Sequence, residues 1–213
     1  MKILSFIFGR KEKSNFNEKN FIENFENDSN EWIDKNSKSE YLIQEIKDGC
    51  LFLKSLTKEM GVCASIFLPI NEQRNYEIET RFKISGIEDL YYSSIEFGIK
   101  RKNRERTLVE GKYIPTTFGS KHYYFGYSNT KEYLITKWKY GTEKYYKRGF
   151  EEEINARDFN TLKILKEKSK MNFYINGKLI HRQKYLKLFG TGIGFATAPN
   201  SELLVDYIKI TYK

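Results

Sequence analysis

The sequence predicts an all-β protein, built as an antiparallel sandwich or barrel. Short segments rich in Ile, Tyr, Phe and Thr recur along the chain, and turn residues bound each of them. One of these segments, residues 75–84, alternates apolar and polar residues over its whole length. No segment shows a helical period over three turns, and residues 151–159 are expected to form one or two helical turns at most. Many short strands with almost no helix are typical of antiparallel two-layer or closed-sheet folds.

The length and composition fit one folded domain. The chain has 213 residues and a formal net charge of +9, and single cores of this size are common. Sixteen Tyr and sixteen Phe are far more aromatic residues than a disordered chain carries. No apolar run approaches the ~20 residues needed for a membrane-spanning helix. The positive charge favours anionic partners without choosing one.

The clearest strand covers residues 75–84. Tyr76, Ile78 and Phe82 share one face with Thr80 and Ile84, whereas charged residues occupy the other face. A period of two over ten residues predicts a long antiparallel strand with one solvated face. The other expected strands cover residues 21–26, 41–46, 50–54, 62–68, 92–100, 121–127, 133–140, 159–165, 171–175, 178–182, 191–197 and 203–212.

A hairpin is expected at Asn176-Gly177. This dipeptide separates two β-prone runs, and it is the preferred sequence of a type I′ turn because both central residues need positive φ. The turn sets a register in which Ile175 faces Lys178 and Tyr174 faces Leu179. The same register places Phe173 opposite Ile180 and His181 opposite Asn172.

Several runs in the C-terminal third resemble one family. They are Phe159-Asn-Thr-Leu-Lys-Ile, Phe173-Tyr-Ile-Asn-Gly-Lys, Gly192-Ile-Gly-Phe and Leu204-Val-Asp-Tyr-Ile-Lys-Ile, with Phe21-Ile-Glu-Asn-Phe-Glu, Trp32, Asp48-Gly-Cys-Leu and Tyr76-Glu-Ile-Glu-Thr-Arg-Phe upstream. Together they resemble the concanavalin A-like lectin and glucanase superfamily, in its laminin-G-like and 3-keto-disaccharide-hydrolase-like branches.

The resemblance implies an antiparallel jelly-roll β-sandwich of two stacked sheets over residues 21–213. Residues 1–20 are then a flexible tail, which either touches a partner or membrane surface or frays. The superfamily includes lectin-like modules, glycoside-cleaving enzymes and interaction domains, so the fold does not choose the function.

The two cysteines are expected to be free thiols. A hairpin turning near residues 56–61 sets Cys50 opposite a residue close to Phe67 rather than opposite Cys63. Free thiols suit a reducing compartment, and no convincing signal peptide precedes the domain, so the sequence predicts a cytoplasmic protein.

No catalytic residues are predicted. Jelly-roll glycosidases resemble one another in placing carboxylates on alternate residues of one strand, and Glu77 and Glu79 are the nearest match. Arg81 and Lys83 continue that face, which favours a solvated surface. Glu96 stands alone between apolar residues, and no nucleophile motif accompanies the two histidines.

No cofactor is predicted. Neither histidine has a cysteine or histidine at zinc-ligand spacing, and the glycines of residues 190–194 are not followed by a helix that would bind a nucleotide. The resemblance leaves room for a structural Ca²⁺ held by residues 27–30 and Asp206, although Asx-rich segments usually form turns.

A binding surface is predicted where aromatic residues are densest, over residues 123–146. One face of each strand there must be core, and the other then displays rings with Lys and His donors. The candidate ligand-binding residues are His122, Tyr124, Lys137, Trp138 and Tyr140. A glycan or a protein partner fits such a surface.

A second candidate surface is the basic segment 100–106, expected as a loop between strands. Its anion-binding candidates are Lys100, Arg101, Lys102, Arg104 and Arg106. The sequence favours a non-catalytic recognition module for a glycan or protein. The alternatives are a jelly-roll glycoside hydrolase and a module that binds nucleic acid or anionic lipid through this segment.

Overall fold

The structure is a computed structural model that describes residues 2–5, 20–33, 42–58, 60–86, 92–101, 106–109, 112–115 and 120–213. Every regular element in these ranges is a β-strand. None of the described residues belongs to a helix with the length and apolar character to cross a bilayer. The two helical turns allowed for residues 151–159 do not form, because this stretch consists of hydrogen-bonded turns and irregular backbone.

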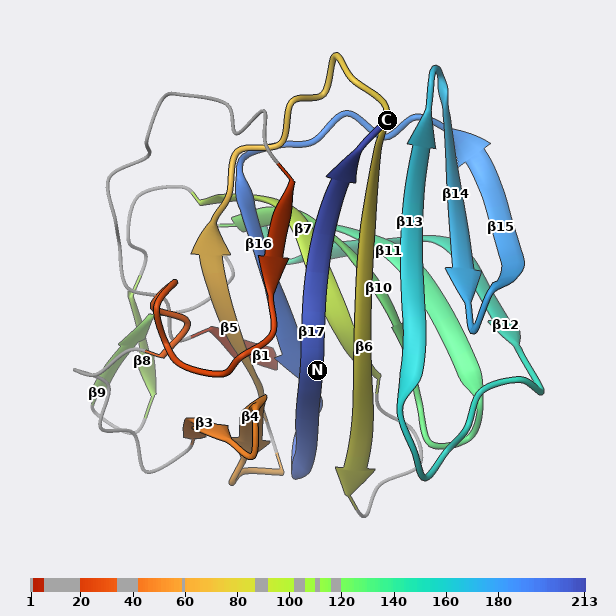
Figure 1. The fold of residues 1–213 in the computed structure, drawn as a ribbon. Coiled ribbons are helices and arrows are strands. Elements are labelled where there is room, and N and C mark those ends of the chain that lie inside the picture. The colour runs from red at the N-terminus through yellow and green to blue at the C-terminus, as the bar shows by residue number, and fades with distance from the viewer. Residues whose placement is uncertain are drawn as a thin grey trace.

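The described strands form two stacked sheets and one separate hairpin (Figure 1). The first sheet has seven strands in the order β1 (Lys2–Ser5), β5 (Met60–Phe67), β16 (Gly192–Thr197), β7 (Ser93–Arg101), β10 (Ser120–Tyr127), β11 (Glu132–Lys139) and β12 (Thr142–Phe150). Strands β8 (Arg106–Val109) and β9 (Lys112–Pro115) pair only with each other.

The second sheet has eight strands and lies in front of the first in Figure 1. Its order is β15 (Lys178–Lys184), β14 (Lys170–Ile175), β13 (Asn160–Glu167), β6 (Tyr76–Gly86), β17 (Ser201–Tyr212), β4 (Cys50–Ser55) and β3 (Leu42–Lys47), and β2 (Phe21–Glu23) also pairs with β17. All pairs are antiparallel except β1 with β5. The predicted antiparallel sandwich is therefore confirmed.

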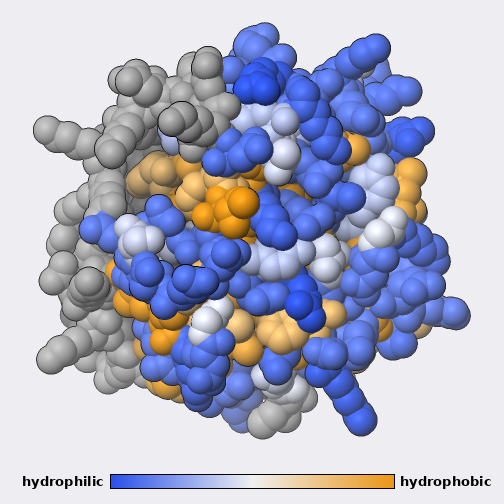
Figure 2. All heavy atoms as spheres, viewed as in Figure 1, coloured by the Kyte–Doolittle hydropathy of each residue, from blue (hydrophilic) through white to orange (hydrophobic). Residues whose placement is uncertain are grey.

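The alternation predicted for β6 sets the inner and outer faces of the eight-stranded sheet. Tyr76, Ile78 and Phe82 are buried, and Glu77 and Arg81 point away from the core. Seen from this side, the surface of the molecule is mostly hydrophilic (Figure 2). This is the burial pattern of a sheet with one solvated face.

Aromatic rings from both sheets interlock between the layers. Phe195 of the seven-stranded sheet packs edge-on against Phe82 of the other sheet, with ring centroids 6.3 Å apart, and against Trp32 at 5.6 Å. Tyr127 stacks on Phe82 at 5.1 Å, and Phe125 meets Phe173 edge-on at 5.3 Å. Because each of these rings has a partner across the layer, the packing fixes the position of one sheet on the other.

The Asn176-Gly177 hairpin is confirmed at its tip. Both residues have positive φ, and Ile175 faces Lys178 while Tyr174 faces Leu179. The register beyond these pairs was predicted wrongly: Phe173 faces His181, and Asn172 faces Arg182. A β-bulge between Phe173 and Tyr174 places an extra residue on β15, which moves every later pair by one position.

The cysteines are free and buried, as predicted, although the hairpin expected between them is wrong. Cys50 lies on β4 in the eight-stranded sheet and Cys63 on β5 in the seven-stranded sheet, so the chain crosses from one layer to the other after Ser55. Burial raises the pKa of the Cys50 thiol.

Strand β12 was not predicted at all.

Phe195→Ala is expected to lower the free energy of unfolding by about 3–5 kcal/mol, because it removes a fully buried ring that contacts both Trp32 and Phe82. Phe150→Ala is the matched control, since that ring is 60% exposed, and its effect is expected to stay within about 0.5 kcal/mol. Urea denaturation followed by circular dichroism measures both variants. Equal losses in the two variants would contradict the interlocked core.

Candidate functional site

The structure divides the predicted ligand-binding residues between two places. His122, Tyr124 and Trp138 lie together on the face of the seven-stranded sheet that points away from the core. They pack on one another, with His122 edge-on to Tyr124 at 4.5 Å and parallel to Trp138 at 6.3 Å between ring centroids. Their exposed fractions are only 0%, 4% and 7%, in that order. As placed, these rings present almost no surface to a ligand.

Glu96 joins these rings and completes what we call the outer-face cluster. The residue is 1% exposed, and its Oε1 lies 3.9 Å from Nε2 of His122. Tyr124 is its cross-strand neighbour on β10. Burial in the first place, and the charge of Glu96 in the second, raise the pKa of Tyr124 well above its ordinary value. The phenol therefore stays protonated at every physiological pH.

The described strands that flank Glu96 place no second acid directly beside it. Its partners on the flanking strands are Tyr124 and Gly194, and the same face of β7 continues into Ser94 on one side and, past a β-bulge, into Ile99 on the other. Glycosidases of the usual kind need two carboxyl groups about 5–10 Å apart. Within the part of the chain that the structure describes, the central strands supply only one.

Two other described carboxylates of this face, Glu132 on β11 and Glu143 on the edge strand β12, have partners of their own. Glu132 accepts hydrogen bonds from Arg148 at 2.8 Å and from Tyr92 at 2.7 Å, and these bonds lower its pKa. Glu143 accepts one from the Tyr145 hydroxyl at 2.9 Å. Both carboxylates serve contacts at the sheet edge.

The remaining two predicted residues, Lys137 and Tyr140, lie elsewhere. Lys137 shares the inner face of β11 with Ile135, on the opposite side from Trp138. Tyr140 occupies the tight turn between β11 and β12, where its φ is +49° and the following Gly141 has φ +86°. Sequence alternation alone had already placed Lys137 and Trp138 on opposite faces of one strand, so one ligand cannot reach both from the same side.

Lys137 and Tyr140 belong to an accessible surface of lysines and aromatic rings. It lies on the inner face of the seven-stranded sheet, beyond the last core side chains. The Lys121 ammonium lies 4.5 Å from the centre of the Tyr140 ring and 6.0 Å from that of Phe189. The Lys137 ammonium lies 5.2 Å from Phe189. Tyr140 is 45% exposed. We call this surface the lysine–aromatic patch; its members are Lys100, Lys121, Lys137, Lys139, Tyr140, Lys144 and Phe189.

The strand registers gather the lysines of the patch. Lys121 on β10 faces Lys100 on β7 at one side and Lys139 on β11 at the other. Lys137 faces Lys144 on β12 in the next row. Directly opposed residues of an antiparallel pair share a face, with Cβ atoms about 5 Å apart. The patch is therefore two adjacent rows of positive charge.

A half-buried acid, Glu72, fixes the loop that carries Phe189. Oε2 of Glu72 accepts hydrogen bonds from the Tyr185 hydroxyl and from the backbone N–H of Leu188, the latter at 2.9 Å. The Tyr123 hydroxyl donates to the Lys187 carbonyl at 2.9 Å, and the Tyr123 ring stacks on Phe189 at 4.9 Å. These contacts hold the Phe189 ring beside the lysines.

Gly190 lets this loop lie against β7. A Cβ at this position would come within 2.4 Å of the Ile99 carbonyl oxygen and 2.8 Å of the Lys100 Cβ. The Gly190 N–H donates to the Gly98 carbonyl at 3.2 Å. Glycine is therefore required for the close approach of the loop, directly after Phe189, to Ile99 and Lys100.

The predicted anion-binding segment is described only in part. Lys100 and Arg101 are the last residues of β7, and Arg106 is the first of β8, so these three are in strands rather than in a loop. Lys102 and Arg104 lie outside the described residues. Of this segment, Lys100 is the residue that the structure places in the lysine–aromatic patch.

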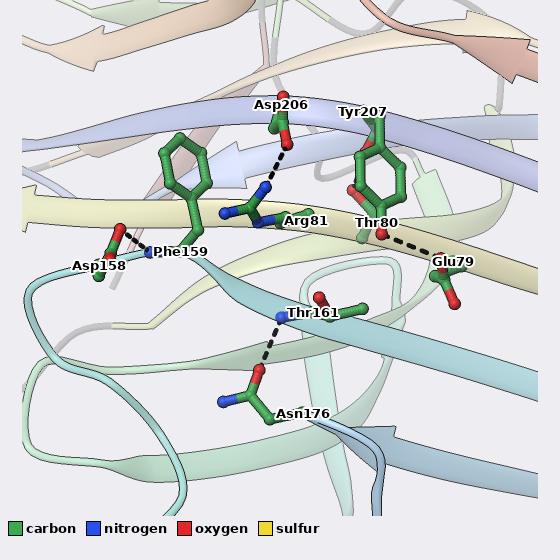
Figure 3. Close-up of polar contacts among 9 residues, drawn as sticks. All are labelled: Glu79, Thr80, Arg81, Asp158, Phe159, Thr161, Asn176, Asp206 and Tyr207. Atoms are coloured by element: carbon green, nitrogen blue, oxygen red, sulfur yellow. Dashed lines mark hydrogen bonds and ion pairs between the residues drawn. The ribbon is translucent and has the colours of Figure 1, made fainter.

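The outward face of the eight-stranded sheet contains the predicted carboxylate pair Glu77 and Glu79. Glu79 accepts a hydrogen bond from the Tyr207 hydroxyl at 2.9 Å, and Glu77 pairs with Lys213 at 2.9 Å. Figure 3 shows Arg81 extending to Asp206, with N–O contact at 3.0 Å, and lying over the Phe159 ring. These charges are matched across neighbouring strands, as expected for a solvated surface.

Several oxygens considered for Ca²⁺ have protein partners, although Oδ2 of Asp28 is buried without one. Asn27 accepts from the Ser29 N–H at 2.9 Å, and Asp28 accepts from the Ile33 N–H at 3.2 Å, so these side chains cap turns. Asp206 is paired with Arg81. Among the described residues no group of three potential ligands meets the geometry of a metal site.

Phe189 and the lysines beside Lys137 were not singled out from the sequence. Lys121, Lys139 and Lys144 are separate residues along the chain, and only the pairing of β10, β11 and β12 brings them together. The turn at residues 128–131 would have set the β10–β11 register, but it carries no Asn-Gly or similar signal. Phe189 reaches the patch through a tertiary contact that has no local signal.

Comparison with known proteins shows the fold. No family model matches the sequence, and no curated protein matches it significantly. Among solved structures, a native glycosidic hydrolase superposes with a TM-score of 0.62 at 14% identity, covering 94% of this chain and 98% of the other. The Bacillus licheniformis β-glucanase superposes with a TM-score of 0.59 at 11% identity, covering 94% of this chain and 100% of the glucanase. The Emp47p carbohydrate recognition domain superposes with a TM-score of 0.55 at 10% identity, covering 85% of this chain and 92% of that domain.

The chain therefore has the concanavalin A-like jelly-roll fold that the sequence resemblance implied. At these identities the likeness describes the architecture, and residue roles do not carry over.

Glu72→Ala is expected to release the loop that carries Phe189, because it removes the acceptor of two hydrogen bonds. Amide exchange at Leu188 should accelerate about 5- to 30-fold, as expected for a loss of about 1–2 kcal/mol. Glu77→Ala is the control, since its carboxylate pairs with Lys213 on the far sheet. Unchanged exchange at Leu188 in the Glu72 variant would show that the acid does not hold the loop.

Proposed function

We propose that this protein is a non-catalytic module that recognises a glycan through the lysine–aromatic patch. The observation that carries the proposal is the position of Tyr140: an exposed ring on a fixed turn, with lysine donors from neighbouring strands beside it. A flat ring flanked by hydrogen-bond donors suits the apolar face and the hydroxyls of a sugar.

The surroundings of Glu96 support a non-catalytic role. Glycoside hydrolysis by the usual mechanisms needs an acid and a second carboxylate as nucleophile or base. Tyr124 and Gly194 are the cross-strand neighbours of Glu96, and Ser94 precedes it on the same face of β7. A tyrosine whose pKa is raised by burial and by a neighbouring anion is a poor substitute, since it cannot ionise at neutral pH.

The proteins that share this fold support a glycan rather than a protein as the ligand. They include a glycosidic hydrolase, a β-glucanase and a carbohydrate recognition domain, all of which act on or recognise sugars by their names. This support is an analogy between folds. The exposed ring and its donors supply the independent physical argument.

Tyr140→Asn is expected to weaken glycan binding by about tenfold or more, because it removes the ring and keeps an Asn-Gly turn, which is the preferred sequence for this geometry. Tyr145→Asn is the matched control: Tyr145 is 56% exposed and lies on the outward face of β12, away from the patch. Binding to a panel of immobilised neutral and acidic glycans measures the wild type and both variants.

The same panel tests the non-catalytic assignment. Glycans incubated with the wild-type protein should release no new reducing ends. Release that disappears in Glu96→Gln would overturn the assignment and identify a hydrolase. Binding of no glycan, together with saturable binding of a purified protein, would overturn the glycan assignment.

A further inference from the structure

Five lysines of the lysine–aromatic patch lie on one surface, and no described carboxylate is paired with them. Lys100, Lys121 and Lys139 form one row across three strands, and Lys137 and Lys144 form the next. None of them forms an ion pair with a carboxylate of the described residues. Elsewhere on the molecule some lysines have such partners: Lys54 pairs with Glu202 at 2.8 Å and Lys213 with Glu77 at 2.9 Å.

Rows of like charge on adjacent strands create a strong local potential. Directly opposed like charges destabilise a sheet, and their fields add outside it. An anion that lies between the rows would contact several ammonium groups together, and this would offset the repulsion among them. The arrangement thus favours a ligand that has negative groups at close intervals.

The rings hold two of these ammonium groups in place. Lys121 lies over Tyr140 at 4.5 Å, and Lys137 lies over Phe189 at 5.2 Å. Cation–π contact restricts these side chains before a ligand arrives. Both lysines are half-buried, whereas Lys139 and Lys144 are exposed and free to adjust. Pre-organised donors lower the entropy cost of binding.

From this arrangement we infer that the glycan recognised at the patch is an acidic polysaccharide, with carboxylate or sulfate groups that the lysine rows bind. The inference rests on the proposed function and names its substrate class. The Tyr140 ring contacts the sugar, and the ammonium groups contact the acidic substituents.

The patch suits an acidic glycan better than a single-stranded nucleic acid. Proteins that bind single strands stack successive bases on several open rings along a groove. Here Tyr140 is the exposed ring of the patch, and Phe189 is stacked on Tyr123 at 4.9 Å between centroids. One open ring with clustered ammonium groups matches a sugar that has an acidic substituent.

Binding of four polymers by isothermal titration calorimetry tests the inference: polygalacturonate for carboxylate, dextran sulfate for sulfate, dextran as the neutral glycan, and single-stranded DNA. Lys121→Gln/Lys139→Gln removes two charges from the longer row. Lys163→Gln/Lys209→Gln is the matched control, since it removes the same charge from lysines that also lie over rings, at 5.2 Å from Tyr174 and 4.0 Å from Tyr207, on the eight-stranded sheet.

We expect wild-type protein to bind one acidic glycan at least tenfold more tightly than dextran, and the Lys121/Lys139 variant to lose about fivefold or more of that affinity. The Lys163/Lys209 variant should bind within about twofold of wild type. Raising the ionic strength from about 20 mM to about 300 mM should weaken wild-type binding more than binding by the Lys121/Lys139 variant, because exposed charges are screened.

Each of the following results would contradict the inference in a different way. Equal binding of dextran and the acidic glycans leaves the proposed glycan function standing and overturns the acidic class. Equal losses in the two lysine variants show a general effect of net charge and overturn the site. Tighter binding of DNA than of either acidic glycan overturns the inference in favour of a nucleic-acid partner. Binding of none of the four polymers overturns the inference, and the wider glycan panel then decides the proposed function separately.

Discussion

The two-residue alternation of β10 and β11 is the constraint on which the functional argument depends. Because successive side chains of a strand point to opposite faces, burying Phe125 and Ile135 in the core sends Tyr124 and Thr136 outward. The same rule carries Lys121, Lys137 and Lys139 onto the inner face, beyond the last core rings. A shift of one residue in the β10–β11 pairing would place the lysines on the outward face and bury their neighbours instead.

The same alternation buries polar side chains in the outer-face cluster, and this burial has a free-energy cost. Glu96 and His122 are both buried, and a buried charge is costly unless it is paired and hydrogen-bonded. The carboxylate of Glu96 lies 3.9 Å from Nε2 of His122, and the Tyr124 ring lies edge-on to the imidazole, so these polar groups face one another inside the cluster. We expect such a network to specify one arrangement of the sheet more than to stabilise it. We therefore interpret the cluster as an anchor for the outward face rather than as a binding surface.

Much of the fold was predictable because local signals carried it. The ten-residue alternation of β6 and the Asn176-Gly177 turn both depend on neighbouring residues, and both were predicted correctly. Strand β12 was missed because it is an edge strand whose residues are nearly all exposed, so no apolar period marks it. The bulge at Phe173 and Tyr174, and the separation of Cys50 and Cys63 into different sheets, result from tertiary packing. Neither has a signal within a few residues of the chain.

The candidate site was predictable only in part, for the same reason. Lys137 and Tyr140 were identified by the density of rings and donors around them, whereas their neighbours Lys121 and Phe189 reach them through strand pairing and through the Glu72-anchored loop. Composition marks where aromatic residues are frequent, but burial decides which of them a ligand reaches. Trp138 and Tyr140 are only two residues apart, and the turn after Lys139 makes the first 7% exposed and the second 45% exposed. The exposed ring with its lysines, and not the larger buried ring, is therefore where recognition is expected.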